Sequence, residues 1–366
     1  MKSKINLLFL GSGVYLKNLV KKFKKEKFTK FLVDLNIDGS TSKIIKKNYR
    51  IDLNNKEKIH DLAKKLKIEA VITNQNDFAM ISYGYLCTKL SLPGIPLKIS
   101  KRFTNKSVSR NYLIKNKTIK KYIPVFYNNY KKFLNNKKKI KNLIIKPINL
   151  QGSRYVFKLN KKNFLEKINF FKNLKQKYLI ENYINGTNYA VESLVLNKKI
   201  INLLISKKTK FPYSFIDKKI VFQANFNSKL QQRIVRINNL IISALGLRDG
   251  LTHLEFKINN KNQIFLIETA CRGAGSGISN IVIPYLTGVD TDEFLYLLST
   301  NGLKNYNPKI NRIKKKCVLK WLYPHQRISQ KIIKSKKNLF FKKKKLKQPQ
   351  KVQQSTDRGG YFINIS

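Results

Sequence analysis

The feature that most constrains the fold is an alternation of short apolar runs and a helical stretch near the N-terminus. The apolar runs occupy 5–10, 31–35 and 70–73, and each is long enough for one buried strand. Between the last two, residues 57–66 repeat their apolar side chains at helical spacing, at Ile59, Leu62, Ala63 and Leu66. Strand and helix in alternation predict a parallel sheet that helices cover on both faces.

The pattern changes after the segment LPGIP at 92–96, where two prolines and a glycine interrupt it. From Leu143 onward the apolar runs NLIIKP, KYLIENYI, NYAVESLVL and KIINLLIS read as strands of a largely antiparallel sheet. Residues 231–245 predict an amphipathic helix, and Gly246 stands where a C-terminal cap belongs. Asp290 and Glu293 have capping-box spacing and predict the start of another helix.

We therefore expect an α/β and α+β chain with three parts. Residues 1–100 would form a parallel α/β domain, and residues 101–313 a domain built on antiparallel sheets. Residues 314–366, although rich in lysine, contain CVLKWLY, KNLFF and GGYFINI and predict a small C-terminal β subdomain.

The composition bounds the class of protein. A length of 366 residues suits two or three domains, 42% hydrophobic content supports buried cores, and no apolar run is as long as a membrane span. The start MKSKINLLFLGSG reads as a first strand and not as a signal peptide. Three cysteines without paired or metal-ligand spacing fit a reducing compartment, so we expect a cytoplasmic protein without a membrane partner.

The formal charge of +57 leaves two interpretations. A basic surface attracts nucleic acids, and clusters lie at 131–141 and 342–347. Against this, lysine is spread over nearly every segment and arginine, the better reader of phosphates and bases, is scarce. We favour a general lysine bias and do not expect nucleic acid as a partner.

Two acidic residues stand out in LTHLEFKINNKNQIFLIETACRGAG, residues 251–275. If the two apolar runs form an antiparallel hairpin that turns at Lys261-Asn262, Glu255 and Glu268 lie directly opposite on one face. Like charges placed in this way destabilise a sheet, so a positive charge is expected between them. One candidate is Mg²⁺, held by the carboxylates and substrate phosphates; the other is a structural ion pair of one Glu with Lys257 or Arg272.

Two further segments suggest phosphate and base contacts. Lys146 ends the strand LIIKP, and in the turn-like INLQGSRY that follows, glycine and a small residue would let backbone N–H groups surround a phosphate. Glu181 ends the strand YLIEN, where backbone groups could meet the edge of a base.

In order and spacing, these segments resemble the ATP-grasp superfamily, in its carboxylate–amine ligase and carbamoyl-phosphate synthase-like branch. VDLNIDGS, with the stretch from DLAKKLKIEA to LPGIP, resembles the N-terminal (pre-ATP-grasp) domain, and TNKSVSRNYL the helix that follows it. LIIKPINLQGSRYV is similar to the phosphate-covering strand and loop, and YLIENYINGTNYAVESLV to the hinge strand. LISKKT, GLTHLEFK, IFLIETACRGAG and STDRGGYFI match a lysine strand, the metal strands and the C-terminal β segment. The second domain would then be the ATP-grasp domain, with a lid at about 115–195.

The resemblance implies the nucleotide-binding residues. Those near the phosphates would be Lys106, Lys146, Gly152 and Ser153. Those of the adenine hinge, which contacts the base largely through its backbone, would be Glu181, Asn182, Tyr183 and Ile184. Glu192 would lie near the nucleotide.

The resemblance also implies the reactive centre. Glu255 and Glu268 would bind Mg²⁺, with Mn²⁺ as the alternative ion. Lys208 would reach the γ-phosphate or the acceptor. Arg272 would steady an acyl-phosphate, where charge builds during the reaction.

Three positions depart from the family pattern. Ala270 stands where an asparagine often completes the metal site, so the second Mg²⁺ loses one contact. Asn188, two positions after Gly186, replaces a glutamate near the ribose. Tyr155 replaces the last glycine of the phosphate loop and would stiffen it.

The implied reaction is an ADP-forming ligation of small molecules such as amino acids. A carboxylate attacks the γ-phosphate of ATP, and an amine displaces phosphate from the acyl-phosphate. The alternatives within the fold are a thiol acceptor, or bicarbonate as in carboxylases and carbamoyl-phosphate-type enzymes. The alternative from another class is a basic nucleic-acid-binding protein. A homodimer is the family-level expectation for assembly.

Overall fold

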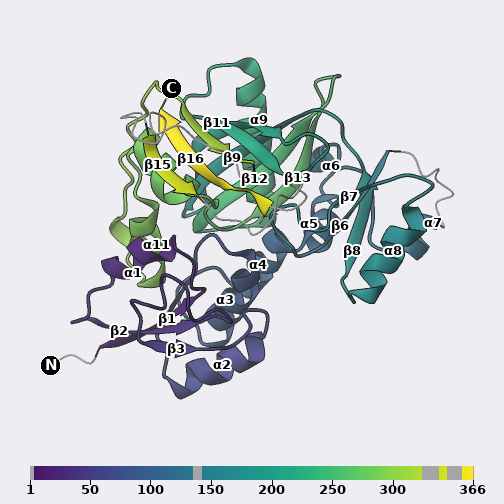
Figure 1. The fold of residues 1–366 in the computed structure, drawn as a ribbon. Coiled ribbons are helices and arrows are strands. Elements are labelled where there is room, and N and C mark those ends of the chain that lie inside the picture. Colours follow the sequence, from purple (N-terminus) through teal and green to yellow (C-terminus); the bar gives the residue numbers. More distant parts are fainter. Residues whose placement is uncertain (1–3, 135–141, 324–337, 344–356, 366) are drawn as a thin grey trace.

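The computed structural model describes residues 4–134, 142–323, 338–343 and 357–365. Parts of both basic clusters, 135–141 and 344–347, therefore lie outside the described residues. Three sheets organise the chain: one near the N-terminus, a large central one and a small one at the side (Figure 1). No helix in the described part of the chain combines the length and apolar character needed to cross a membrane.

The N-terminal sheet is parallel, as expected from the alternation of strands and helices. Its strand order is β3-β2-β1-β4, with β1 at Ile5–Leu10, β2 at Phe28–Val33, β3 at Lys47–Tyr49 and β4 at Ala70–Ile72. The accompanying helices are α1 (Leu16–Lys22), α2 (Lys56–Lys65), α3 (Asp77–Lys89) and α4 (Leu97–Thr104). Strand β1 is buried on both sides: Leu7 and Phe9 belong to one apolar core, and Leu8 and Leu10 to another. Both cores also include residues of the central sheet.

The central sheet has eight strands in the order β13-β12-β9-β10-β11-β14-β16-β15, all paired antiparallel. The strands are β9 (Thr187–Leu196), β10 (Lys199–Lys210), β11 (Asp217–Gln223), β12 (Gly250–Ile258), β13 (Ile264–Ala270), β14 (Cys317–Trp321), β15 (Asn338–Lys343) and β16 (Gly360–Ile365). Because β14 pairs with β11, the described strands of the segment 314–366 continue the central sheet instead of forming a sheet of their own. The domain boundaries themselves stay predictions.

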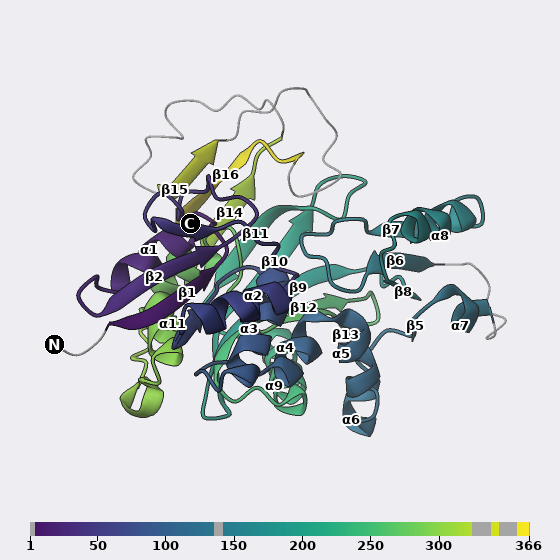
Figure 2. The ribbon, with the colours of Figure 1, turned by 90° about the horizontal axis from the view of Figure 1, so that it is seen from below.

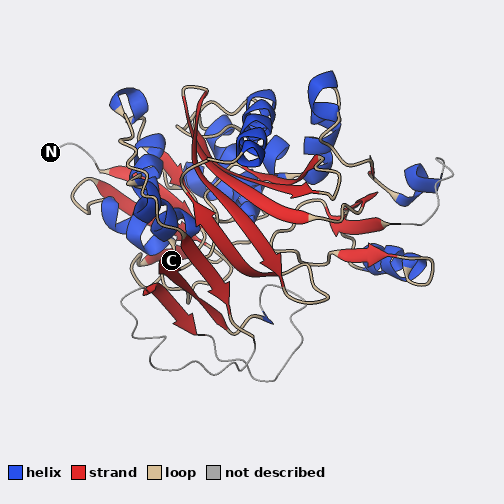
Figure 3. Ribbon diagram, turned by 90° about the horizontal axis from the view of Figure 1, so that it is seen from above, coloured by secondary structure: helices blue, strands red, loops and turns tan. Residues whose placement is uncertain are grey.

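Helices connect and cover this sheet (Figure 3). They are α5 (Lys106–Leu113), α6 (Lys117–Lys120), α9 (Lys229–Leu245), the π-helix η1 (Ile278–Val282), α10 (Ile283–Thr287), α11 (Thr291–Ser299) and the 3₁₀ turn η2 (Leu303–Asn305). The predicted helix at 231–245 corresponds to α9, which ends at Gly246 with φ +80°, a left-handed conformation that glycine adopts readily. Asp290 caps α11 as predicted, because its carboxylate accepts the N–H groups of Asp292 and Glu293.

The third sheet projects from the side of the molecule with two helices of its own (Figure 2). Its order is β5-β8-β6-β7, and its elements are β5 (Phe126–Tyr127), α7 (Tyr130–Leu134), β6 (Leu143–Pro147), β7 (Phe157–Leu159), α8 (Phe164–Asn173) and β8 (Tyr178–Asn182). A separate apolar core holds it together. This sheet ends at Asn182, and β9 belongs to the central sheet, so the expected lid range of about 115–195 includes this sheet and most of β9; the range itself stays a prediction.

A buried acid in α11 gives a prediction about stability. Asp292 is 5% exposed, and burial, reinforced by Asp290, raises its pKa from 3.8 to about 6. The folded state therefore keeps a proton that the unfolded chain releases, and stability falls as pH rises from about 4 to about 6. We expect Asp292→Asn to stabilise the protein by about 2 to 3 kcal/mol at pH 7.5 and to change little at pH 4. Urea unfolding at both pH values measures this, and equal stability of variant and wild type at pH 7.5 would contradict it.

Candidate nucleotide and metal site

The hairpin of β12 and β13 places Glu255 directly opposite Glu268, as predicted. The predicted register also holds for His253 and Leu254, which face Ala270 and Thr269, but between the glutamate pair and the turn it is wrong by one residue. It would place Phe256 opposite Ile267, but a bulge after Glu255 shifts the partner of Phe256 to Leu266. The carbonyl of the extra residue, Ile267, accepts hydrogen bonds from Arg110 Nη2 at 2.7 Å and Lys146 Nζ at 3.2 Å. Cations from distant segments therefore satisfy the backbone that the bulge leaves unpaired.

A cavity of about 260 Å³ lies between the side sheet and the central sheet. Nine of the thirteen predicted site residues line it: Lys106, Lys146, Ser153, Glu181, Asn182, Tyr183, Ile184, Glu255 and Glu268. Asn188, one of the three departures from the family pattern, lines it as well. Residues that are far apart in the sequence, from α5, both sheets and the hairpin, are thus brought to one place. The four predicted residues that do not line this cavity are Gly152, Glu192, Lys208 and Arg272.

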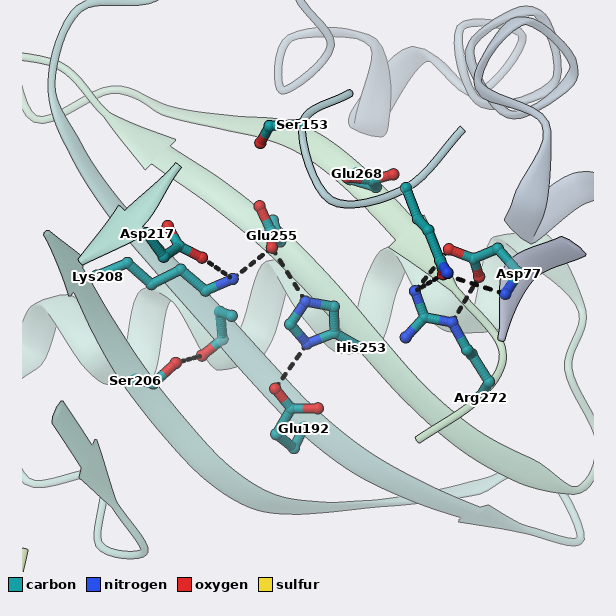
Figure 4. A network of polar contacts seen from close by, with 12 residues as sticks. Asp77, Ser153, Glu192, Ser206, Lys208, Asp217, His253, Glu255, Glu268 and Arg272 are labelled. Atoms are coloured by element: carbon teal, nitrogen blue, oxygen red, sulfur yellow. Dashed lines mark hydrogen bonds and ion pairs between the residues drawn. The ribbon is translucent and has the colours of Figure 1, made fainter. Parts of the chain in front are cut away.

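Each carboxylate of the opposed pair contacts its own lysine. Lys106 Nζ lies 2.7 Å from Glu268, and Lys208 Nζ forms a close ion pair with Glu255 (Figure 4). Lys208 also lies 3.5 Å from Asp217. From the sequence, Lys257 and Arg272 were the candidate ion-pair partners of these glutamates. In the described residues the partners are Lys106 and Lys208 instead.

These contacts keep Glu255 ionised. Burial alone would raise the pKa of Glu255, but Lys208 and then His253 outweigh it, and the pKa lies well below its usual range. Burial would likewise lower the pKa of Lys208, but Glu255 and Asp217 raise it above its ordinary value. A charged carboxylate and a charged lysine thus stand together beside the cavity.

Glu181 lies in a buried cluster at the end of β8. It is 2% exposed, forms a close ion pair with Lys146 and lies 3.4 Å from Arg110 Nε. The two cations hold the pKa of Glu181 below its ordinary value although burial opposes them. Its side chain is therefore engaged with the protein. The backbone N–H groups of Asn182 and Tyr183 are engaged as well, since they donate to the carbonyls of Val125 and Asn142 at 2.9 and 2.7 Å.

Arg272 forms a two-point ion pair with Asp77, the first residue of α3. Nε and Nη2 of Arg272 lie 2.6 and 2.5 Å from the two oxygens of Asp77 (Figure 4). Gln151 joins them, since its Oε1 accepts the N–H of Asp77 at 3.2 Å and Arg272 Nη2 at 3.4 Å. This cluster links the N-terminal sheet, the loop after β6 and the end of β13. The sequence pattern singled out Arg272 but not Asp77.

Glu192 lies behind the opposed pair, not against the cavity. It is 1% exposed, and its Oε1 lies 2.6 Å from His253 Nδ1. The other ring nitrogen of His253 lies 3.1 Å from Glu255 Oε1. Burial would lower the pKa of His253, but Glu192 and Glu255 raise it to about 9. His253 is thus a link between two carboxylates.

Sequence reasoning also missed two lysines that line the cavity. Lys210 lies on β10 and is 2.7 Å from Asp217. Lys257 contacts the face of the Tyr183 ring, 4.4 Å from its centroid. Burial, with Lys210, Lys146 and Lys158 nearby, lowers the pKa of Lys257 to about 8. Strand alternation could have found both, because each lies two residues after a predicted site residue and so on the same face.

The loop after β6 has a left-handed backbone at Gly152, Ser153 and Tyr155, with φ of +69°, +56° and +55°. Tyr155 thus adopts a left-handed conformation that glycine favours, and its ring packs against Phe170 with the centroids 5.3 Å apart. Ser153 Oγ donates to the carbonyl of Phe215 at 3.1 Å. Non-glycine residues in this conformation cost free energy and are often found at ligand sites.

The donor set suits magnesium in part. Glu255 and Glu268 are ionisable oxygen ligands on adjoining strands, and both line the cavity. In the described segments no cluster of three or more His, Cys, Asp or Glu side chains is arranged to hold a metal ion. Mg²⁺ is usually held by one or two carboxylates plus water and substrate phosphates, so this pair fits an ion that arrives with a nucleotide.

Comparisons with known proteins agree on the fold. A family model described as "ATP-grasp domain" matches residues 139–280. The structure of an L-amino acid ligase from Bacillus licheniformis superimposes with a TM-score of 0.77 at 18% identity, covering 100% of this chain and 94% of that one. N5-carboxyaminoimidazole synthetase from Staphylococcus aureus, in complex with ADP, gives 0.75 at 14% identity, with coverage of 100% and 94%.

A third similar structure is the biotin carboxylase domain of the Hydrogenobacter thermophilus 2-oxoglutarate carboxylase, in complex with MgADP, ADP and bicarbonate. Its TM-score is 0.69 at 14% identity, with coverage of 100% of this chain and 87% of that one. A comparison with curated protein sequences finds no match. At these identities the structures establish the fold over the full length, and the family model establishes the domain. Residues 139–280 therefore match an ATP-grasp domain, and the chain shares its fold with these ligase structures.

Proposed function

We propose that the protein is an ATP-dependent, ADP-forming ligase that couples a small carboxylate to an amine through an acyl-phosphate. The observation that carries this proposal is the opposed pair Glu255 and Glu268, which share one cavity with Lys106 and Lys146. Paired carboxylates for a metal, beside lysines for phosphates, are what a magnesium–nucleotide complex requires.

The nucleotide would lie along the cavity. The backbone of Ile184, the last residue of the predicted hinge, would meet the base, while Lys106 and Lys146 would contact the phosphates. Gly152 and Ser153 would cover the phosphates from the loop after β6. Asn188 carries an amide that can hydrogen-bond a ribose hydroxyl without adding charge.

In the first step a carboxylate oxygen of the substrate attacks the γ-phosphorus, the bond to the β,γ-bridging oxygen breaks, and ADP leaves. Magnesium, held by Glu255 and Glu268 when bound, would neutralise phosphate oxygens. Lys106 and Lys208 stand next to these carboxylates and would add positive charge toward the γ-phosphate. In the second step the amine nitrogen attacks the acyl carbon and inorganic phosphate leaves.

Arg272 would steady the acyl-phosphate. It now pairs with Asp77 and Gln151, so part of its guanidinium would have to turn from this cluster toward the substrate. Since Asp77 comes from α3, a helix of the N-terminal part of the chain, we place substrate recognition on this side of the site. Amino acids are our first candidate substrates, and the similarity to an L-amino acid ligase supports them.

A screen of acceptors tests the reaction. Purified protein with MgATP is offered amino acids singly and in pairs, hydroxy acids, thiols and bicarbonate, with release of ADP and phosphate measured and products identified by mass spectrometry. We expect ADP release only with a carboxylate–amine combination, and an amide product. ADP release that depends on bicarbonate alone would favour the carboxylase-type alternative, which the similarity to a biotin carboxylase domain keeps open. A thioester product would favour a thiol ligase.

The charge of +57 supports one alternative from another class. A nucleic-acid-binding protein would bind RNA or DNA without ATP, with an affinity that falls steeply with salt. Filter binding at 50 and 200 mM salt separates the two proposals. The assembly that we propose is a homodimer, since the similar biotin carboxylase domain is a dimer. We place the reaction in the cytoplasm because Cys87, Cys271 and Cys317 are buried and unpaired.

A further inference from the structure

One row of side chains crosses three strands next to the opposed carboxylates. In the register of the central sheet His253 on β12 lies opposite Glu192 on β9 and Ala270 on β13. The neighbouring row contains Ala190, Glu255 and Glu268. Ala270 has a small side chain, so the imidazole of His253 can lie flat between the rows and contact Glu192 and Glu255 together (Figure 4).

His253 bridges the two carboxylates. Its Nδ1 lies 2.6 Å from Glu192 Oε1, and its Nε2 lies 3.1 Å from Glu255 Oε1. Because Nε2–H can donate to Glu255 while Glu192 holds the other ring nitrogen, the ring is fixed from both sides.

Glu192 is not placed to touch a ligand. It is 1% exposed and does not line the cavity, and in the described part of the chain its Oε2 has no hydrogen-bond partner. A buried polar group with one oxygen unpaired is costly, so the contact of Oε1 with His253 is what holds the Glu192 side chain in place. Glu192 can therefore influence the cavity only through that ring.

The effect on Glu255 follows from which oxygen is used. Both Lys208 and His253 donate to Oε1 of Glu255, and no hydrogen bond within the described residues involves Oε2. Two donors on one oxygen fix the plane of the carboxylate, and they leave the other oxygen for the cavity that Glu255 lines. If Lys208 were its one donor, the carboxylate of Glu255 could rotate about the Cγ–Cδ bond.

We propose that the Glu192–His253 pair is a positioning device: it turns Oε1 of Glu255 toward the sheet and presents Oε2 to the metal of the nucleotide complex. The inference rests on the proposed function, in which Glu255 binds that metal. It changes the role of Glu192, which the family resemblance places near the nucleotide. His253 and Glu192 are positioning residues, and neither touches ATP.

Two substitutions of His253 separate the two contacts. Asparagine reaches as far as Nδ1 and can donate to Glu192 but not to Glu255. Glutamine reaches as far as Nε2 and can donate to Glu255. Glu192→Gln keeps the size of the side chain and replaces the carboxylate by a neutral amide, a weaker hydrogen-bond partner for Nδ1 of His253. His60→Asn is the matched control, because His60 lies on α2, 3.6 Å from Asp61, and does not line the cavity.

The measurements are the Kd of Mn²⁺ in the presence of ATP, from the electron paramagnetic resonance of free Mn²⁺, and the Kd of metal-free ATP by calorimetry. We expect His253→Asn and Glu192→Gln to weaken Mn²⁺ binding by about 10- to 100-fold, as loss of a group that orients a metal ligand does. Metal-free ATP should bind within about twofold of wild type in both. His253→Gln should recover most of the Mn²⁺ affinity, and His60→Asn should match wild type.

Three outcomes would overturn the proposal. Wild-type Mn²⁺ affinity in His253→Asn and Glu192→Gln would remove the positioning role while leaving the proposed function intact. An equal loss of metal-free ATP binding in Glu192→Gln would mean that Glu192 contacts the nucleotide after all. Wild type that binds no Mn²⁺ with ATP would remove the proposed function itself, and this inference with it. If His253→Asn does not fold, the Mn²⁺ affinity of the isosteric variant Glu192→Gln tests the same proposal.

Discussion

Replacing Glu268 by glutamine should lower the rate of ADP formation by about 10²- to 10³-fold, the size of effect seen when one preorganised group that stabilises a transition state is removed. Glutamine keeps the shape of the side chain but binds a hard cation more weakly than a carboxylate. Lys106, now 2.7 Å from Glu268, would keep a neutral acceptor. Folding should be nearly unaffected, because the Glu268 side chain is 26% exposed.

The measurement is coupled-enzyme detection of ADP under saturating MgATP, with the melting temperature recorded in parallel. Glu166→Gln is the matched control, since Glu166 is an exposed acid on α8 paired with Lys167 at 2.6 Å. It should leave the rate unchanged. A Glu268→Gln variant that turns over like wild type would contradict the assigned site.

Arg272→Ala should affect both activity and folding. We expect ADP formation to fall by about 10²- to 10³-fold, since the charge that would steady the acyl-phosphate is lost. The free energy of unfolding should fall by about 3 to 5 kcal/mol, because Asp77 is left as a buried, uncompensated carboxylate. The sequence alone gave no reason to expect the second effect.

A double variant separates these two effects. Asp77→Asn combined with Arg272→Ala removes both charges, so stability measured by urea unfolding should largely return while ADP formation stays low. If the double variant regained activity along with stability, Arg272 would have only a structural role. If Arg272→Ala were as stable as wild type, the ion pair with Asp77 would make no contribution to the free energy of unfolding.

Local patterns were enough to predict the parts of the site that share one hairpin. Glu255 and Glu268 were paired from strand alternation and one assumed turn, and the structure has the same pair. The bulge directly after Glu255 could not be predicted in this way. It depends on Arg110 and Lys146, which approach the Ile267 carbonyl from other elements.

Local patterns also could not predict which acid each cation of the site pairs with. Motifs indicated Lys106, Lys146, Lys208 and Arg272 as cations of the site, but not that they pair with Glu268, Glu181, Glu255 and Asp77. Such pairs form across sheets that meet only in the folded chain. The role of His253 was missed for the same reason, since Glu192 comes from a strand 61 residues earlier.

Among the helices and strands, segments with a strong apolar periodicity were predicted correctly, and segments with a weak pattern were not. The strand at 5–10 and the helix at 231–245 were found, because their apolar pattern matches one element over its whole length. The short edge strand β3, with no fully buried side chain, gave no such pattern and was missed. The course of the C-terminal segment into the central sheet depends on β14 pairing with β11, a long-range contact.

The central claim is that two facing acidic side chains hold a metal against the phosphates of ATP. Calorimetric titration of ATP with and without magnesium tests it, in wild type and in a Glu255→Gln, Glu268→Gln double variant. We predict that magnesium tightens ATP binding at least about tenfold in wild type, as removal of a metal-site contact typically costs that much or more, and that the double variant loses this difference. Equal affinity of wild type with and without magnesium, or a double variant that keeps the full magnesium effect, would contradict the account.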